Sequence, residues 1–359
     1  MSALPSDLRA LDRPALEALA VELGQPAFRG RQLFKWIHEK HADGFEAMTD
    51  LPAAFRDELA ARYALGTLTE VRRQTATDRT VKCLYRLPSG RHIEAVLIPD
   101  FDAEGAPRRM TACVSSQVGC AMGCTFCATG LMGFQENLTA GQITDQARAM
   151  DDLARERFGK GLTNVVFMGM GEPLQNYAAV TTSVRLMHEG LGLGARRITV
   201  STVGLARRIR QLADDQAAGR VPACRLAISL HAPTDAQRSA IMPVNRSEKT
   251  DLDALRDAVR HFHAVTGRPV TYEYCLFEGV NDAVEDARHL ARVARWAPSK
   301  VNLILYNPVA GTPFRSSSEP RLNAFVAELV ARDVRVTVRR SRGQDIDAAC
   351  GQLAVAEGA

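Results

Sequence analysis

The stretch CVSSQVGCAMGCTFCATG, residues 113–130, holds four of the eight cysteines in this 359-residue chain. Three of them form the spacing C-x3-C-x2-C, namely Cys120, Cys124 and Cys127. The fourth, Cys113, stands seven residues earlier, and Cys350 lies far away in DIDAACGQL. The stretch begins within a predicted strand, 111–115, so the clustered cysteines fall in the loop that follows a strand. This loop carries the strongest indication of the fold and the function of the chain.

The composition is that of an ordinary globular protein, with 46% hydrophobic and 24% charged residues. No apolar run approaches the roughly 20 residues needed to cross a bilayer. The first residues, MSALPSDLRALDRPALEALA, lack the continuous apolar segment of a secretory signal. We therefore expect a cytoplasmic protein without membrane association, whose clustered cysteines bind metal or act in catalysis rather than form structural disulfides. The net charge of +4 permits a polyanionic partner without requiring one.

From residue 111 onward, short apolar runs alternate with amphipathic segments. Seven runs are typical of strands: 111–115, 164–168, 198–201, 226–229, 270–276, 301–306 and 334–338. The clearest helix between them covers 141–158 and starts with a capping box of Thr139 and Gln142. Repeated strand–helix units predict a parallel sheet, either doubly wound or curled into a barrel.

Unusual motifs follow the ends of these predicted strands. After the cysteine loop come GMGEPLQN, STVG, SLHAP, YNPVAGTP and RSRGQDIDAACG, at the second, third, fourth, sixth and last strands. In parallel barrels, the loops at the carboxyl ends of the strands build the active site. The pattern therefore predicts that these motifs and the three cysteines meet at one central pocket.

The first 66 residues have helical patterns only. One helix is expected after Asp12 and Pro14, a second over 29–40 and a third over 52–63. We interpret them as a small accessory domain. Its basic side chains could contact a phosphate backbone, but a solvated helix face explains them nearly as well.

Two extended runs, 80–87 and 92–99, are joined by the turn sequence PSG and predict a β-hairpin. Alternation places Glu94 on the same face as Val96 and Ile98. A buried carboxyl there would have a raised pKa and could accept a proton. An edge strand with an outward Glu94 fits the same alternation equally well.

The three-cysteine loop admits two metal interpretations. A structural zinc site has four ligands and usually combines two distant pairs of cysteines or histidines. No second C-x2-C pair occurs in the sequence, and Cys113, a conceivable fourth ligand, lies on the preceding strand. A [4Fe–4S] cluster normally takes four cysteines, so three would leave one iron open for another ligand. The cluster therefore gives a reason for three cysteines that zinc does not.

C-x3-C-x2-C with Phe126 before the last cysteine is the signature of radical S-adenosylmethionine (SAM) enzymes. The ordered set CVSSQVGC, GMGEPLQN, ITVSTVG, LAISLHAP, PVN (243–245), YNP and DIDAACGQL resembles the RlmN family of RNA adenine-C2 methyltransferases. The resemblance runs from the N-terminal helices to the last dozen residues. It implies an α/β fold, a partial parallel (βα)6-type radical SAM barrel with an N-terminal helical accessory domain and a β-hairpin extension. We divide the chain into the accessory domain (1–66), a hairpin linker with Glu94 (67–105), the radical SAM core (106–344) and a C-terminal catalytic loop and tail (345–359).

The resemblance also implies site residues. Cys120, Cys124 and Cys127 would hold a [4Fe–4S] cluster whose open iron binds the amino and carboxylate groups of SAM. The positions that match the family's SAM contacts are Gly171, Glu172, Ser201, Ser229, Leu230, His231 and Asn307. Taken singly, such residues are more typical of turns or of a satisfied core histidine. Their common location at strand ends favours the cofactor interpretation.

In the family's mechanism, two SAM molecules are used per turnover. Cys350 takes a methyl group from one by displacement, an instance of nucleophilic catalysis. Reductive cleavage of the second gives a 5′-deoxyadenosyl radical, which removes hydrogen from methylated Cys350. The resulting carbon radical adds to adenine C2 and ties the RNA to Cys350. Glu94 matches the proposed acceptor of the C2 proton, and Cys113 matches the thiol that frees the product by forming a disulfide with Cys350.

The implied substrates are 23S ribosomal RNA, in the peptidyl-transferase region, and transfer RNA, at the adenosine next to the anticodon. The implied enzyme is a monomer reduced by a donor such as flavodoxin or ferredoxin. The residues alone do not decide between C2 and the sister reaction at adenine C8.

Two further alternatives come from other classes of protein. A zinc-stabilised RNA-binding protein without catalysis would leave Cys350 without a role. A radical enzyme for a small molecule is disfavoured by the helical domain and by five arginines near the third strand: Arg196, Arg197, Arg207, Arg208 and Arg210. Cys83, Cys224 and Cys275 match no functional position and are interpreted as buried small hydrophobic residues.

Overall fold

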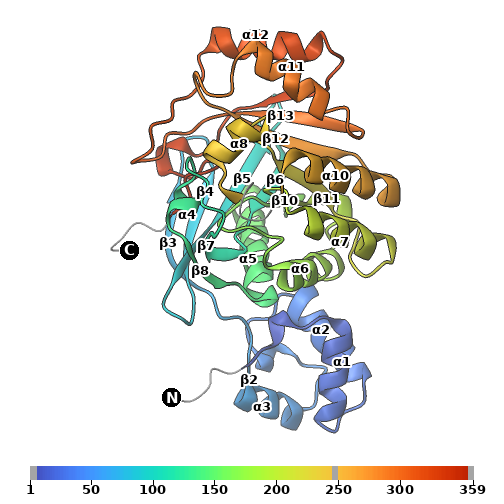
Figure 1. Cartoon of the computed structure of the whole chain (residues 1–359). Helices are drawn as coiled ribbons and strands as arrows, with labels where there is room; N and C mark the ends of the chain where they lie inside the picture. Colours follow the sequence, from blue (N-terminus) through green and yellow to red (C-terminus); the bar gives the residue numbers. More distant parts are fainter. Residues whose placement is uncertain (1–5, 245–249, 355–359) are drawn as a thin grey trace.

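The computed structural model describes residues 6–244 and 250–354 (Figure 1). Its centre is a mixed ten-stranded sheet with the order β14-β13-β12-β11-β10-β9-β6-β5-β4-β3. Every neighbouring pair of strands between β6 and β14 in this order is parallel. They are β6 (Pro107–Cys113), β9 (Asn164–Phe167), β10 (Ile198–Thr202), β11 (Arg225–Ser229), β12 (Val270–Leu276), β13 (Ser299–Leu305) and β14 (Val336–Arg339). All seven predicted strands are present to within a few residues, and the predicted fold class is confirmed.

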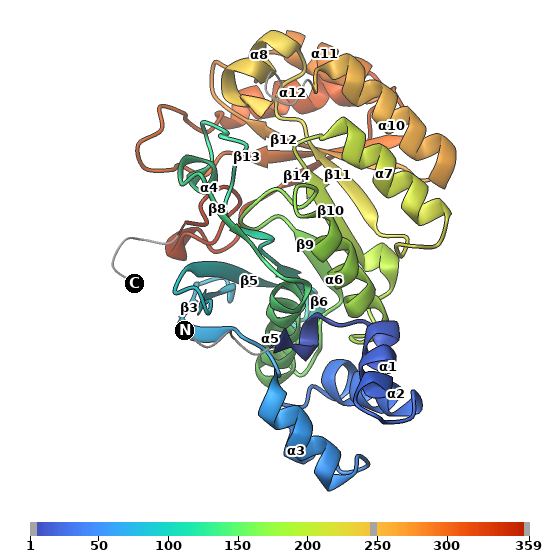
Figure 2. The same ribbon diagram turned by 60° about the horizontal axis from the view of Figure 1, so that its bottom comes forward.

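Helices connect these strands, and Figure 2 shows α6, α7 and α10 following one another along the outside of the sheet. The helices of this part are α5 (Ala140–Phe158), α6 (Tyr177–Glu189), α7 (Ala206–Ala217), α8 (Asp235–Ile241), α10 (Leu252–Thr266), α11 (Val284–Val293) and α12 (Glu319–Val330). The capping box of α5 is confirmed: the Gln142 N–H donates to Thr139 Oγ1 at 3.1 Å, and the Thr139 N–H donates to Gln142 Oε1 at 2.9 Å. The helix ends at Gly159, whose φ of 66° favours glycine.

The N-terminal part is a helical unit (Figure 1). Its small apolar core also includes Ala140 of α5 and Leu186 of α6. The unit contains a short parallel pair of strands and three α-helices: β1 (Ser6–Asp7), β2 (Tyr63–Ala64), α1 (Arg13–Glu22), α2 (Phe28–Phe34) and α3 (Ala53–Arg62). Asp12 caps α1 as predicted, because its side chain accepts from the Ala15 N–H at 3.1 Å. The unit contacts the sheet domain through Arg9, whose Nη1 lies 3.1 Å from Asp145 Oδ1 on α5.

The predicted hairpin consists of β4 (Val81–Arg86) and β5 (His92–Phe101), which pair antiparallel. A further strand that the sequence did not predict, β3 (Thr69–Thr75), pairs with β4. On its other side, β5 pairs with β6, so the hairpin is continuous with the parallel sheet. The division of the chain at residues 66, 105 and 344 stays a prediction.

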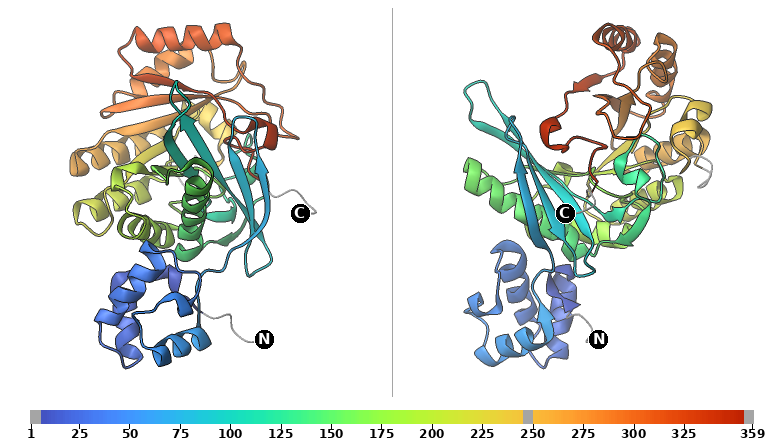
Figure 3. Two further views of the ribbon diagram at one scale, coloured as in Figure 1. Left: turned by 180° about the vertical axis from the view of Figure 1, so that it is seen from behind. Right: turned by 90° about the vertical axis from the view of Figure 1, so that its left-hand side faces the viewer.

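The loops after β6 and after β14 both lie at the carboxyl ends of the parallel strands. After β6, the chain forms the ribbon β7 (Gln117–Gly119) and β8 (Phe134–Asn137), with the cysteine loop and α4 (Ala128–Leu131) between them. After β14, residues 341–354, here called the C-terminal loop, return toward the β3–β4 turn (Figure 3). They are fixed there by the Thr77 N–H, which donates to Asp345 at 2.9 Å, and the Gly343 N–H, which donates to Asp78 at 3.0 Å.

No helix among the described residues is long and apolar enough to span a bilayer. Asn245, the last residue of the PVN motif, lies outside the described residues.

Candidate active site

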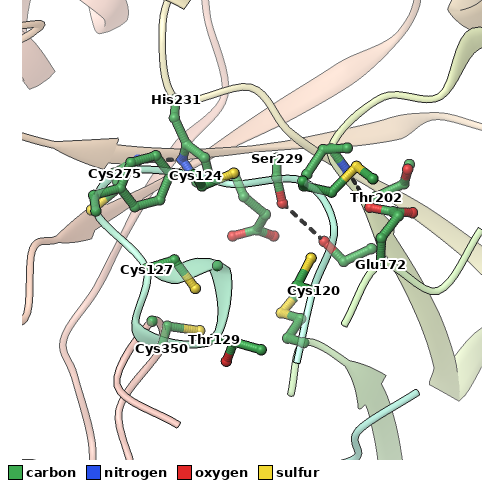
Figure 4. Close-up of a pocket in the computed structure, with 18 of the residues that line it drawn as sticks. Cys120, Cys124, Cys127, Thr129, Glu172, Thr202, Ser229, His231, Cys275 and Cys350 are labelled. Atoms are coloured by element: carbon green, nitrogen blue, oxygen red, sulfur yellow. Dashed lines mark hydrogen bonds between the residues drawn. The ribbon is translucent and has the colours of Figure 1, made fainter. Parts of the chain in front are cut away.

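A central cavity lies at the carboxyl ends of the parallel strands (Figure 4). Nine of the predicted site residues line it: Cys120, Cys124, Cys127, Gly171, Glu172, Ser201, Ser229, His231 and Cys350. They come from the cysteine loop, from the loop after β9, from strand β10, from the end of β11 and the loop after it, and from the C-terminal loop. Residues that are up to 230 positions apart, from Cys120 to Cys350, thus meet in one place.

The three clustered cysteines are free thiols. Burial raises the pKa of Cys120 to about 12 and also raises the pKa values of Cys124 and Cys127, with neighbouring thiols contributing. A bound cation would reverse this preference, since metals bind cysteine as thiolate.

Their spacing in space bears on the binding of a single ion. Among the described residues, the group of metal-type ligands whose donor atoms all lie within 4.8 Å of one another is His41, Asp151 and Asp152, not the cysteines. Two sulfurs on one zinc ion would be at most about 4.6 Å apart, because the Zn–S bond is about 2.3 Å long. As placed in this structure, the three sulfurs therefore do not all lie close enough together to bind one zinc ion.

Gly171 and Glu172 follow β9 and form one wall of the cavity. Gly171 has a φ of 98°, and a Cβ there would lie 2.6 Å from the Gln117 Cβ, so the position requires glycine. The carboxylate of Glu172 accepts from the backbone N–H groups of Leu174 at 2.9 Å and Val203 at 2.8 Å. Burial raises the pKa of Glu172 to about 7, although these hydrogen bonds act in the opposite direction.

Ser201, Ser229 and His231 line the cavity from β10 and β11. The two serine hydroxyls lie 3.4 Å apart. His231 has a left-handed backbone (φ 53°), and its Nδ1 accepts from the Cys275 N–H at 3.0 Å. Burial lowers the pKa of His231 to about 3, so the ring is neutral and carries its proton on Nε2.

Two of the predicted SAM contacts lie elsewhere in this structure. Leu230 is fully buried, and its N–H donates to the Glu273 carbonyl at 3.0 Å. Asn307 Nδ2 donates to the Cys350 carbonyl at 3.3 Å, while its Oδ1 accepts from Gln344 at 2.9 Å. Asn307 thus holds the C-terminal loop beside the cavity rather than lining the cavity itself.

Cys350 lies where two cavities meet. In the central cavity it lies close to Cys127 (Figure 4), and it also lines a second cavity together with Cys113. Cys113 ends β6 and is 6% exposed. Burial and, to a smaller extent, Cys350 raise the pKa of Cys113 to about 12. The structure therefore places Cys113 and Cys350, which are far apart in the sequence, in the lining of the same cavity.

Glu94 faces a third cavity of about 470 Å³, which Arg72, Gln74 and Asp347 also line. The side chain is buried, so the alternative of an outward Glu94 on an edge strand is wrong. Lys82 Nζ lies 3.1 Å from Glu94 Oε1. Burial raises the pKa of Glu94, and Lys82 partly offsets this rise. Glu94 is separated from the central cavity by the C-terminal loop, which contributes residues to both cavities.

Two residues of the site were not predicted from the sequence. Cys275, interpreted as a small hydrophobic residue, is buried but also lines the central cavity, as does Glu273 two positions earlier. A carboxyl inside the apolar strand VTYEYCL was the available signal for Glu273. Cys83 and Cys224 are fully buried, as expected. None of the five arginines between 196 and 210 lines any of the three cavities, so they do not surround the pocket as expected.

Comparison with known proteins adds family relationships. Residues 6–65 match the Ribosomal RNA large subunit methyltransferase N-terminal domain, and residues 114–291 match the Radical SAM superfamily. The chain is 56% identical to the "Probable dual-specificity RNA methyltransferase RlmN" of Salinibacter ruber, over 97% of this chain and 94% of the relative. It is 45% identical to the dual-specificity RNA methyltransferase RlmN of an Anaeromyxobacter species, over 98% and 91%. The crystal structure of a radical SAM methyltransferase from Sphaerobacter thermophilus superposes with a TM-score of 0.89 at 46% identity, covering 97% of this chain and 99% of that one.

Proposed function

The chain belongs to the RlmN family of radical SAM RNA methyltransferases, and from this membership we propose that it methylates C2 of adenosine in 23S ribosomal RNA and in transfer RNA. The observation that carries the proposal is the position of Cys350 between two cavities, one with the three clustered cysteines and one with Cys113. A methyl carrier must reach both a methyl donor and the thiol that later releases it.

Radical SAM family membership implies SAM and a [4Fe–4S] cluster as cofactors. Cys120, Cys124 and Cys127, whose thiols line one cavity, would hold the cluster. When bound, the cluster and two SAM molecules per turnover supply an electrophilic methyl group and a hydrogen-abstracting radical.

The chain's own residues bind and orient the methyl donor. Glu172, fixed by two backbone N–H groups, offers a carboxylate to the amino group at the methionine end. The hydroxyls of Ser201 and Ser229, together with the Nε2–H of neutral His231, provide hydrogen bonds along the cavity wall. Leu230 and Asn307 do not line this cavity.

The reacting residues lie around the C-terminal loop. Cys350 accepts the methyl group on sulfur and stays attached to adenine after addition at C2. Glu94, whose pKa is raised by burial, accepts the C2 proton. Cys113 then attacks Cys350 sulfur and forms a disulfide.

The third cavity is the proposed entry for the target adenosine. Its volume of about 470 Å³ falls within the range of about 300–1,000 Å³ typical of small-molecule pockets. Arg72 at its edge offers a cation to the RNA backbone, and an adenosine turned out of the RNA fold could present its base edge to Glu94. We further propose that the enzyme is a cytoplasmic monomer reduced by a flavodoxin- or ferredoxin-type donor.

The test is mass spectrometry of nucleosides from ribosomal and transfer RNA of cells that lack their own enzyme and express this chain. We expect 2-methyladenosine with the wild-type chain and none with Cys350→Ala. A matched control, Cys224→Ala, removes a fully buried thiol outside the cavities and should retain the product. 8-Methyladenosine would instead assign the sister reaction, and unmodified adenosine would overturn the proposal.

A further inference from the structure

The second cavity joins two strands from opposite ends of the parallel sheet. Cys113 ends β6 and Arg339 ends β14, and these strands bound the parallel part of the sheet on its two sides. Both residues nevertheless line the same cavity, together with Cys350. Arg339 Nη1 lies 3.6 Å from Met168 Sδ, just beyond β9, so its guanidinium reaches across the open side of the barrel.

Arg339 lacks an anionic partner among the described residues. No ion pair there includes it, and its hydrogen-bond partner is a thioether sulfur, which is a weak acceptor. Glu273 on β12 acts on Arg339 at longer range, but Glu273 Oε1 accepts from Asn302 at 2.9 Å. The other charged residue that lines the cavity, Arg342, is half-exposed and lies 4.0 Å from Asp100. No carboxylate lines this cavity in the described part of the chain.

A cation that lines the same cavity as two thiols, and that makes no ion pair at contact distance among the described residues, stabilises the charged form of a thiol. Cys350 and, more weakly, Glu273 and Cys113 raise the pKa of Arg339, and Arg339 in turn opposes the rise that burial causes in the pKa of Cys113. Thiolate rather than thiol is the species that attacks sulfur.

We propose that Arg339 is a positioning residue that stabilises the Cys113 thiolate for the release of methylated RNA. This inference rests on the proposed function. In the release step, the Cys113 thiolate forms a bond to Cys350 sulfur, and the bond from that sulfur to the RNA methylene carbon breaks. The electron pair of the broken bond stays on the methylene carbon, which takes a proton and becomes the methyl group. The two sulfurs are oxidised to a disulfide, and the carbon is reduced.

Residue-resolved alkylation of the cluster-loaded protein with iodoacetamide tests the proposal without RNA or SAM. Removing a cation that lines the same cavity raises a thiol pKa by about one unit, so Arg339→Gln should slow alkylation of Cys113 about tenfold at pH 8. Arg339→Lys keeps the charge and should retain most of the rate. Arg342→Gln, which removes a paired charge from the same cavity, is the matched control and should leave the rate unchanged.

Alkylation of Cys224, fully buried at the start of β11, reports unfolding in the same samples. If Arg339→Gln exposes Cys224, the test depends on Arg339→Lys instead. A tenfold lower alkylation rate of Cys113 in Arg339→Lys, with Cys224 still protected, overturns the proposal. An unchanged Cys113 rate in a folded Arg339→Gln variant, or an equal loss in Arg342→Gln, overturns it as well.

A second readout separates this inference from the proposed function. With SAM, reductant and RNA, Arg339→Gln should accumulate RNA covalently attached to Cys350, as Cys113→Ala should, and Arg339→Lys should not. Absence of the adduct in Cys113→Ala contradicts the proposed function, whereas the alkylation rates still decide the role of Arg339.

Discussion

At the scale of single residues, Lys82 and Glu94 show how one buried ion pair supports a reactive group. Their side chains are 8% and 3% exposed, and Lys82 Nζ also donates to the Asp347 carbonyl of the C-terminal loop at 3.2 Å. Lys82 thus opposes the effect of burial on Glu94 and fixes the loop that carries Cys350. Breaking a buried pair from one side typically costs about 3–5 kcal/mol, since the remaining charge has no partner.

Lys82→Met should therefore lower the free energy of unfolding by about 3 kcal/mol at pH 8. Without Lys82, the pKa of Glu94 in the folded state would lie still further above its pKa in the unfolded state. A carboxyl of this kind contributes stability below its unfolded pKa and loses it as the pH rises, so the defect should shrink at pH 5. Urea unfolding at both pH values measures it.

The double variant Lys82→Met, Glu94→Gln should recover much of the loss, because no charge remains buried. Arg62→Met, which breaks an exposed pair with Glu58, should change stability by no more than about 1 kcal/mol. Equal losses in the buried and the exposed variants would contradict the account of Lys82.

The cluster prediction also belongs to single residues. Anaerobically purified protein should be brown and contain about four irons per chain, the complement of a [4Fe–4S] cluster. Cys124→Ala should lose the colour and the cleavage of SAM, because one ligand is missing. Cys275→Ala, which alters a cavity thiol outside the C-x3-C-x2-C spacing, should keep its iron. Stoichiometric zinc in an active wild-type protein would contradict the cluster assignment.

At the scale of elements, the C-terminal loop forms a shared wall between cavities, and its attachment to the β3–β4 turn sets where Cys350 lies. The Asp78 carboxylate accepts hydrogen bonds from the Gly343 N–H at 3.0 Å and from the Thr80 N–H at 3.0 Å. These hydrogen bonds and Arg342 lower the pKa of Asp78 although burial opposes them. The side chain is therefore a charged anchor for the loop.

Asp78→Ala should loosen the loop without removing any group that touches a substrate. We expect methylation to fall at least tenfold, iron content to stay unchanged, and limited proteolysis to cut between residues 341 and 354. The matched control is Asp102→Ala, since Asp102 holds the β5–β6 turn rather than the C-terminal loop, by accepting from the Ala106 N–H at 2.8 Å. An intact loop and full activity in Asp78→Ala would contradict the anchoring role.

The elements differ in how well the sequence predicts them. The central parallel strands were predictable because they are largely buried on both faces and read as short apolar runs, as in β12. Strand β3, TEVRRQT, was not predicted because it is almost entirely exposed at the sheet edge and has no apolar alternation. Charged residues are common on such edges, where they discourage pairing with another chain.

The candidate site was predictable only in part. Motifs at strand ends indicated one pocket, and nine of the predicted residues do line one cavity. The meeting of Arg339 with Cys113 could not be predicted, since it depends on how far the sheet curls to bring β14 near β6. The separation of Glu94 from the central cavity depends on the path of the C-terminal loop, which has no periodic pattern.

At the scale of the whole molecule, the N-terminal unit has a buried histidine that makes its stability depend on pH. His38 is 4% exposed, and its Nε2–H donates to the Leu11 carbonyl at 3.1 Å. Burial lowers the pKa of His38 to about 4 from an ordinary value of 6.5. The folded unit therefore contains the neutral ring.

A histidine with a lowered folded pKa stabilises fully above its unfolded pKa and loses that contribution as the pH falls toward the folded pKa. The N-terminal unit should therefore lose up to about 3 kcal/mol of stability between pH 6.5 and pH 4. Hydrogen exchange of α1 and α2 across this range measures the loss. His38→Gln should flatten the pH dependence, while His263→Gln, at a half-exposed histidine that also contacts a carbonyl at 2.9 Å, should preserve it.

The position of Cys350 after the last strand has a consequence for synthesis of the protein. Domains fold as they emerge from the ribosome, N-terminal parts first. A chain interrupted between residues 340 and 349 has already made every described strand of the sheet and the cysteine loop, yet it lacks the proposed methyl acceptor. Cys350 is thus the last of the proposed catalytic residues to be translated, and we expect such an unfinished chain to leave RNA unmethylated.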